Sequence, residues 1–293
     1  YQRLRERGEG ARAYLMVLAD HALQNFASSG IRTGFGDARL RIGPAKIFLD
    51  GSIGGRTARL REPYLNDADN RGLWMQNPET MRDTLARAHS AGWQLCAHAI
   101  GDAAIDLLLD CYEGILAEEP RPEARPRIEH CEFVGDEEVF ERISRLGAVP
   151  VPGTTFLREF RSVYEASLGS GRLRYANALR SFADRGIVAA ASSDAPVVSP
   201  DPLAGIQTMI TRRDRDGIAA FAEEAVTLEE AVRAYTLAGA YASFEEDVKG
   251  SLTPGKLGDV AVLDADLRSI AADEIEEASV DLTVLGGEVV YAR

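Results

Sequence analysis

Four polar residues stand at the ends of short apolar runs in this chain of 293 residues. In chain order they are Lys46, His98, His130 and Asp194. Helix-like stretches separate these runs, as in parallel barrels, where catalytic groups lie at the carboxyl ends of different strands. Two imidazoles and a carboxylate suit Zn²⁺, and also Fe, Mn or Ni. The sequence therefore predicts a metal-hydrolase site, with Zn²⁺ as the first expectation.

Lysine is rare in this chain, which makes Lys46 informative. Lys occurs only at positions 46, 249 and 256, so almost all of the 33 basic residues are Arg. Lys46 lies inside the apolar stretch Ile-Gly-Pro-Ala-Lys-Ile-Phe-Leu. Burial lowers the pKa of a lysine, and the neutral amine can act as a base or react with CO₂ to form a carbamate ligand. The alternative is a strand lysine that reaches solvent or an ion-pair partner.

Strand-helix repeats are predicted to position these residues. Strands are expected at 11–18, 42–49, 93–99, 126–131, 148–151 and 187–193, and helices at 19–27, 78–91, 101–116, 136–146, 176–184, 201–212 and 227–242. These make about six pairs where a closed (β/α)₈ barrel needs eight. We therefore expect an α/β fold, a TIM-type barrel over 1–247 that lacks its opening strands. A small β segment should follow over 248–293, with a hairpin at Gly286-Gly287.

A long aperiodic stretch at 50–76 is predicted to be a binding loop, because loops of this length in compact domains are usually functional. Arg56 and Tyr64 within it are candidate substrate contacts. Asp102 follows the His98 strand, where two roles stay open. It could orient a metal-binding side chain through a hydrogen bond without itself binding the metal, or it could cap the helix that begins after Gly101.

Composition narrows the class of protein. A formal net charge of -13 argues against a general nucleic-acid binder, because binding to phosphate backbones requires clustered basic residues. No apolar run is long enough to span a membrane, and the first residues lack the apolar core of a signal peptide. The three cysteines show no CxxC spacing. We expect a cytoplasmic enzyme in a reducing compartment, with no membrane or nucleic-acid partner.

The chain resembles the amidohydrolase superfamily, in its amidohydrolase-3 branch of YtcJ-like and N-substituted formamide deformylase-like metal-dependent hydrolases. The segments that carry the resemblance are Lys46-Ile-Phe-Leu-Asp-Gly-Ser, His98-Ala-Ile-Gly-Asp, Arg127-Ile-Glu-His-Cys, Ser193-Asp-Ala-Pro-Val, Pro202-Leu, Thr211-Arg-Arg and Gly250-Ser-Leu-Thr-Pro-Gly-Lys. The resemblance implies a deformed barrel with Lys46, often carboxylated, and His98, His130 and Asp194 as ligands of one or two divalent ions. It also implies that Asp194 is the general base in hydrolysis of an amide or related non-peptide C–N bond of a small molecule. A homo-oligomer is compatible with it.

Two features depart from that family pattern. The family opens with a His-x-His pair, whereas the other histidines here, His21 and His89, fall on predicted helices away from a barrel mouth. The stretch Val151-Pro-Gly-Thr also replaces an expected Gln-Pro. We therefore expect this chain to lack the N-terminal part and to hold a partial metal site. Two alternatives stay open: a catalytically impaired or regulatory protein on an amidohydrolase scaffold, and a lactonase- or esterase-type barrel hydrolase.

Overall fold

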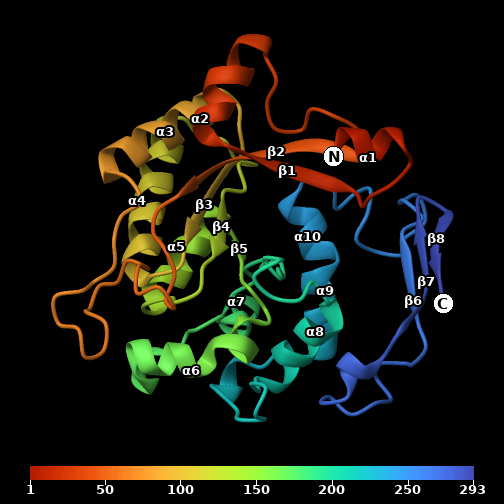
Figure 1. Ribbon diagram of the computed structural model, residues 1–293. Coiled ribbons are helices and arrows are strands. Elements are labelled where there is room, and N and C mark those ends of the chain that lie inside the picture. The colour runs from red at the N-terminus through yellow and green to blue at the C-terminus, as the bar shows by residue number, and fades with distance from the viewer. The chain divides into compact units, whose positions relative to one another are not determined.

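The computed structural model describes residues 1–293 apart from the side chain of Ala27 (Figure 1). It divides into two compact units, which each hold part of the predicted site. Unit 1 comprises residues 1–131 and 137–149, and unit 2 comprises residues 132–136 and 150–293.

A parallel sheet forms the centre of unit 1. Its strands are β1 (Ala13–Leu18), β2 (Leu40–Phe48), β3 (Leu95–Ala99) and β4 (Arg127–His130), paired in this order. Strand β5 (Val149–Val151) begins at the last residue of unit 1 and continues into unit 2. The register places Phe48, His98 and Glu129 side by side across β2, β3 and β4. Since side chains alternate between the faces of a strand, these residues share one face with Lys46 and Cys96.

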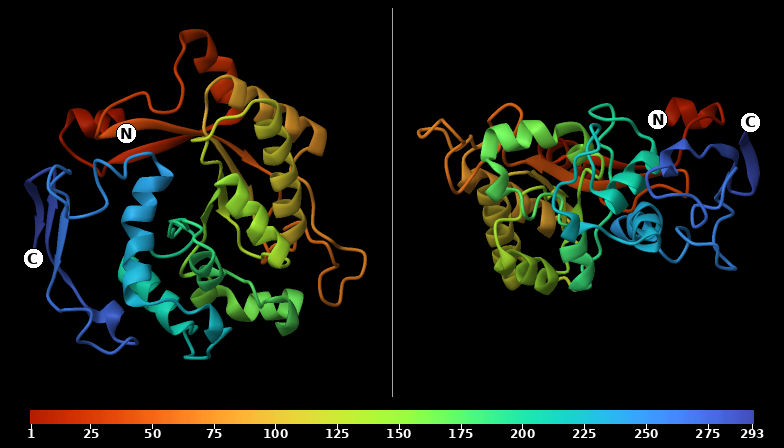
Figure 2. Two further views of the ribbon diagram at one scale, coloured as in Figure 1. Left: turned by 180° about the vertical axis from the view of Figure 1, so that it is seen from behind. Right: turned by 90° about the horizontal axis from the view of Figure 1, so that it is seen from below.

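Helices cover the other face of this sheet. They are α3 (Pro78–Ser90), α4 (Asp102–Glu118) and α5 (Glu137–Leu146), which lie side by side along the strands in both views (Figures 1 and 2). Asn77 caps α3, because its side chain accepts a hydrogen bond from the Glu79 N–H. Helix α4 buries Ile105, Leu108 and Tyr112, which recur at helical spacing.

Short helical pieces complete unit 1: α1 (Gln2–Glu6), α2 (Ala19–His21), η1 (Ala22–Phe26) and η2 (Ala27–Ser29). The helix predicted at 19–27 is therefore divided, with a single α turn followed by a π turn.

Unit 2 combines helices with a second sheet. Its helices are α6 (Phe156–Leu168), α7 (Leu179–Asp184), α8 (Pro202–Thr211), α9 (Leu228–Tyr235) and α10 (Leu237–Ala242), with short turns η3 (Ser170–Arg172), η4 (Ala222–Glu224) and η5 (Ile275–Glu277). An antiparallel sheet of β6 (Val260–Leu263), β7 (Val280–Leu285) and β8 (Glu288–Ala292) lies in the segment predicted to be β. Gly286 and Gly287 both have positive φ, which confirms the predicted hairpin turn.

Two predictions in unit 2 are wrong. The helix expected at 227–242 is broken at Thr236, whose φ of −119° and ψ of −88° leave the helical region, so α9 and α10 are separate. The strand expected at 187–193 is an extended segment that is not assigned as a strand. Its N–H groups at Ala190 and Ser192 donate to the carbonyls of Pro150 and Pro152, but Pro152 has no N–H with which to continue the ladder. One bridge, Gly153 to Ser192, remains.

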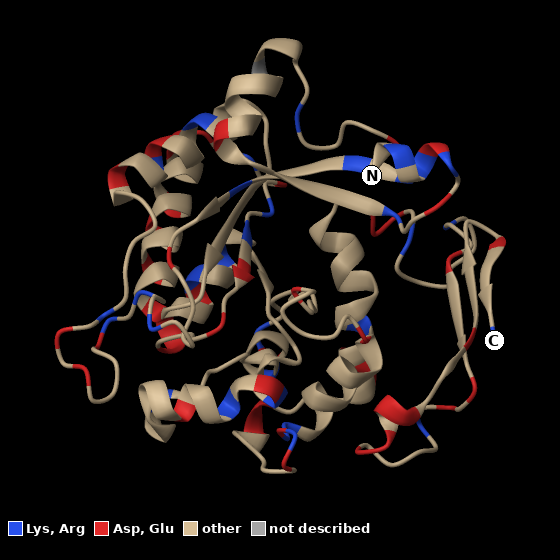
Figure 3. Cartoon of the chain, in the orientation of Figure 1, with Lys and Arg blue, Asp and Glu red and all other residues tan. Residues whose placement is uncertain are grey.

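Charged residues of both signs lie along α3 and α5 (Figure 3). In unit 1, for example, Arg142 on α5 forms two hydrogen bonds with Glu113 on α4, with Nε to Oε1 and Nη2 to Oε2 both at 3.0 Å. These ion pairs tie neighbouring helices together over the buried sheet. Among the described helices, none has both the length and the apolar character that crossing a membrane requires.

Candidate metal centre

Three of the predicted site residues come together in unit 1. Lys46, His98 and His130 belong to the neighbouring strands β2, β3 and β4. The ring centroids of His98 and His130 are 4.5 Å apart, at an interplanar angle of 68°. Lys46 Nζ lies 4.8 Å from the ring centroid of Phe48, and that ring lies 5.5 Å from the His98 ring. The carboxyl ends of these strands thus gather an amine and two imidazoles.

The backbone turns sharply to bring His130 to this place. Strict alternation along β4 would put His130 on the face opposite to Glu129. Instead, His130 and Cys131 have φ values of 70° and 44°, in the left-handed region. That region costs a non-glycine residue about 1–3 kcal/mol, and such strain is typical of functional sites. The strain is consistent with a requirement that the His130 imidazole face His98.

The electrostatic setting keeps His130 neutral. Burial, followed by the charges of His98 and Lys46, lowers the pKa of His130 well below its usual value. A neutral imidazole has a free nitrogen lone pair, and this is the form that binds metals. The same setting therefore prepares His130 as a ligand at neutral pH.

His98 is held by one ring nitrogen. Its Nε2 lies 2.9 Å from the carbonyl oxygen of Gly51 and 3.4 Å from Oδ1 of Asp50. Both are acceptors, so Nε2 carries the proton and donates it. In a neutral ring this leaves the lone pair on Nδ1. Metal-bound histidines almost always donate their other N–H in this way.

A buried ion pair lies on the same face of the sheet. Arg127 donates two hydrogen bonds to Glu129, at 2.8 and 3.1 Å, and Cys96 Sγ lies 3.2 Å from Glu129 Oε1. Both charged residues are buried, with 8% of each exposed. Because Arg127 and Glu129 pair with each other, we assign them a structural role in the interior of the protein.

The donor set in unit 1 fits a divalent metal on one condition. Catalytic zinc sites commonly use three protein ligands. His98 and His130 could supply two imidazole nitrogens, and Lys46 could supply either an amine nitrogen or a carbamate oxygen. An ammonium group would repel a cation, so Lys46 must bind as the neutral amine or as a carbamate. Among the described residues, no three His, Cys, Asp or Glu side chains are grouped to hold a metal ion. Lys46 is therefore essential to this interpretation.

Asp194 belongs to unit 2. It follows the extended segment at 187–193, is exposed, and has a φ of 52°. Its N–H donates to Ser192 Oγ at 3.1 Å, and its carbonyl accepts from Val197 at 2.9 Å. Its left-handed backbone resembles that of His130. Its role as ligand and base stays a prediction.

The long loop at 51–76 is internally hydrogen bonded. Tyr64 is 2% exposed, and its hydroxyl donates to the carbonyl of Ala58 at 2.9 Å. Arg56 is partly exposed, above the Tyr64 ring and 3.6 Å from an oxygen of Asp67. Substrate binding by Arg56 and Tyr64 stays a prediction. Tyr64 already holds the loop together.

Asp102 fastens the same loop to a helix. Its Oδ1 accepts hydrogen bonds from the N–H groups of Arg61, at 2.9 Å, and Ala103, at 3.0 Å. These contacts agree with a structural role at the start of α4. Its predicted influence on a metal ligand is untested.

Sequence reasoning overlooked Asp50. Asp50 directly follows Leu49 at the end of the β2 segment, is 1% exposed, and lies beside His98. A carboxylate placed directly after a buried apolar strand was the available signal.

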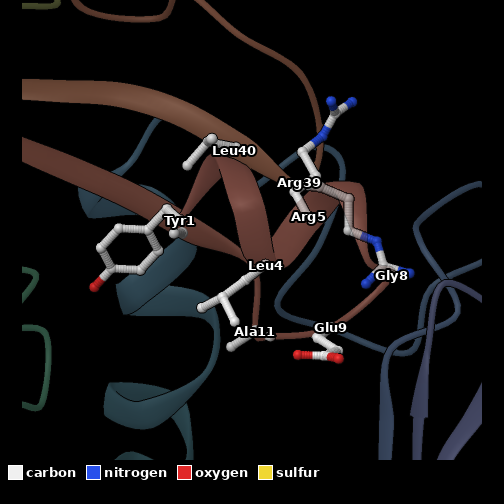
Figure 4. A pocket seen from close by; sticks show the side chains of 10 residues that line it. Tyr1, Leu4, Arg5, Gly8, Glu9, Ala11, Arg39 and Leu40 are labelled. Carbon is white, nitrogen blue, oxygen red and sulfur yellow. The ribbon is translucent and has the colours of Figure 1, made fainter.

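The pocket shown in Figure 4 lies elsewhere in unit 1. It has a volume of about 420 Å³ and is lined by Tyr1, Leu4 and Leu40, among others. Leu40 is the first residue of β2, so the pocket lies at the amino ends of the strands. The histidines occupy the carboxyl ends, and this pocket is therefore separate from the candidate centre.

Comparison with known proteins identifies the family. The model of the amidohydrolase family matches residues 1–291. The chain belongs to the amidohydrolase family. This confirms the resemblance found in the sequence.

Relatives and solved structures agree with this assignment. YtcJ of Bacillus subtilis (strain 168), named as an amidohydrolase, is 31% identical over 87% of this chain and 48% of its own length. N-substituted formamide deformylase of Arthrobacter pascens is 29% identical over 87% of this chain and 46% of its own. An uncharacterized metal-dependent hydrolase from Pyrococcus furiosus has a TM-score of 0.74 at 28% identity, covering 87% of this chain and 51% of that protein. The amidohydrolase chain thus spans about half the length of these relatives.

Proposed function

We propose that this amidohydrolase chain forms part of a metal-dependent hydrolase that cleaves amide or related non-peptide C–N bonds of small molecules. The convergence of His98, His130 and Lys46 at the ends of adjacent parallel strands carries the proposal. Family membership and the similarity to metal-dependent hydrolases support it. We further propose that the parallel sheet is part of a (β/α)₈ barrel, and that the enzyme acts in the cytoplasm.

Each residue has a distinct part in this proposal. His98 through Nδ1, His130 and Lys46 would hold the ion, for which Zn²⁺ is the first choice. A bound divalent ion would lower the pKa of a water molecule toward neutrality. Asp194, which belongs to unit 2, is proposed as general base and metal ligand because it matches the family pattern. It would accept a proton from the attacking water as the water oxygen bonds to the carbonyl carbon, and it would deliver that proton to the nitrogen as the C–N bond breaks.

Hydrolysis assays on matched substrates test the proposed reaction. The Zn²⁺-loaded protein is compared on N-substituted formamides, simple amides and lactones. We expect C–N cleavage to exceed lactone opening, and we expect Asp194→Asn to lower kcat by about 100-fold or more, the scale of general acid-base catalysis. Asp184→Asn, which alters an exposed carboxylate on α7, is the control and should leave kcat unchanged. Preferential lactone cleavage, or an Asp194→Asn protein as active as the wild type, would overturn the proposal.

A further inference from the structure

Asp50 is a buried carboxylate that accepts hydrogen bonds from three backbone N–H groups. Its Oδ1 accepts from the N–H of Ile100 at 3.1 Å, and its Oδ2 accepts from Gly101 at 2.9 Å and from Arg59 at 2.8 Å. A carboxylate that is 1% exposed needs such donors, because burial without them is costly. Asp50 therefore joins the exit of β2, the exit of β3 and the loop that contains Arg59.

The same carboxylate faces the ring of His98. Oδ1 lies 3.4 Å from Nε2, while the neighbouring carbonyl of Gly51 lies 2.9 Å from it. Two oxygens on one side of the ring favour a proton on Nε2. They also disfavour a ring flip, which would turn a carbon toward these acceptors and leave the N–H without them.

The Gly51 carbonyl is itself fixed in place. The Gly51 N–H donates to the Thr57 carbonyl at 3.1 Å, and a Cβ at position 51 would lie 2.1 Å from Thr57 Oγ1. Only glycine allows this close approach. Asp50 and Gly51 thus form a rigid double acceptor for one histidine nitrogen.

We propose that Asp50 is a positioning residue that fixes the tautomer of His98, so that Nδ1 faces the metal. The expected effect on metal binding rests on the proposed function, whereas the fixed tautomer of His98 rests only on the contacts described above. Asp50 acts through His98 and has no contact with substrate in this scheme. Its loss should weaken metal binding by about 10- to 100-fold, the usual effect of removing a group that orients a ligand.

Asp50→Asn tests this role, with Asn70→Ala as the matched control. Asn70 accepts from the Gly72 N–H at 2.9 Å and donates to Asp67 at 3.1 Å, so its removal loosens the same loop without altering the two acceptors of His98. Asparagine at position 50 keeps the size of the side chain but presents an amide N–H₂ where a second acceptor stood.

The first readout is ¹⁵N NMR of the histidine rings in the metal-free protein at one fixed pH, with His98 assigned by its loss in His98→Gln. Wild type and Asn70→Ala should show the Nε2–H tautomer, and Asp50→Asn should show a mixture with Nδ1–H. An Nδ1–H tautomer in the wild type would overturn the proposal even if Asp50→Asn failed to fold. So would an unchanged tautomer in folded Asp50→Asn.

The second readout is Zn²⁺ affinity measured by competition with a chelator. Asp50→Asn should lose about 10- to 100-fold, and Asn70→Ala less than a few-fold. Equal losses in both variants would show a loop effect and contradict the proposal. A wild-type protein that binds no Zn²⁺ would instead refute the proposed function, while the tautomer measurement would still decide the role of Asp50.

Discussion

The substitution Gly101→Ala tests the tight junction that surrounds Asp50. Gly101 precedes α4, and its φ of −75° would suit alanine. However, an added Cβ would lie 2.0 Å from the carbonyl oxygen of Arg59, well inside a close carbon–oxygen contact of about 3.3 Å. Because this neighbour is backbone, the loop must move.

The expected cost follows from that displacement. Overpacking of this kind costs about 1–3 kcal/mol. Displacing the loop also weakens the two hydrogen bonds that Asp50 Oδ2 accepts from Gly101 and Arg59, each contributing about 1 kcal/mol. We expect Gly101→Ala to lower the free energy of unfolding of unit 1 by about 3 kcal/mol and to weaken metal binding.

Gly114→Ala is the matched control in the same helix. Gly114 lies within α4, and an added Cβ would meet no atom within 4 Å. Alanine there should raise the free energy of unfolding by about 0.5–1 kcal/mol, because glycine is unfavourable inside helices. Urea unfolding followed by tryptophan fluorescence measures both variants, since Trp74 and Trp93 both belong to unit 1. Unchanged stability in Gly101→Ala, or equal destabilisation in both, would refute the reasoning.

Two further predictions concern titrating groups. Burial raises the pKa of three thiols, those of Cys96, Cys111 and Cys131. All three should therefore react slowly with a thiol reagent at pH 8 in the native protein and rapidly in denaturant. Fast labelling of Cys96 or Cys131 in the native protein would contradict this prediction. Hydrogen bonds from Arg142 lower the pKa of Glu113, so the ion pair stabilises the protein at pH values above the ordinary pKa of glutamate. There, Arg142→Ala should lower the free energy of unfolding by about 1 kcal/mol, and this loss should shrink as the pH falls through the lowered pKa of Glu113. Urea unfolding at several pH values measures the loss, and a loss that does not vary with pH would contradict the prediction.

Local signals made most of unit 1 predictable. Apolar runs located β2 and β3, and the helix predicted at 78–91 agrees with α3 to within a residue at each end. The strands that carry Lys46, His98 and His130 are neighbours in the parallel sheet, in the order of the chain, and the roles of these residues stay predictions. Each of these inferences depended on residues close in sequence or on the regular geometry of a parallel sheet.

The failures involve partners distant in sequence. The segment at 187–193 has the composition of a strand, but its status depended on Pro152 in the neighbouring segment. Asp50 looked like a loop residue because its donors, Ile100 and Gly101, lie about fifty positions away. The turn that directs His130 toward His98 requires two residues with left-handed backbone, and neither of them is a glycine that would have indicated this conformation in the sequence. Tertiary contacts determined each outcome.

Zn²⁺ binding to the purified, metal-stripped protein tests the central claim most directly. The account predicts at least one ion per chain, with clear losses of affinity in His98→Ala, His130→Ala and Lys46→Ala. His21→Ala, which removes an exposed histidine in the same unit, should bind like the wild type. A wild-type chain that takes up no metal, or ligand variants that bind as tightly as His21→Ala, would contradict the assignment of this site.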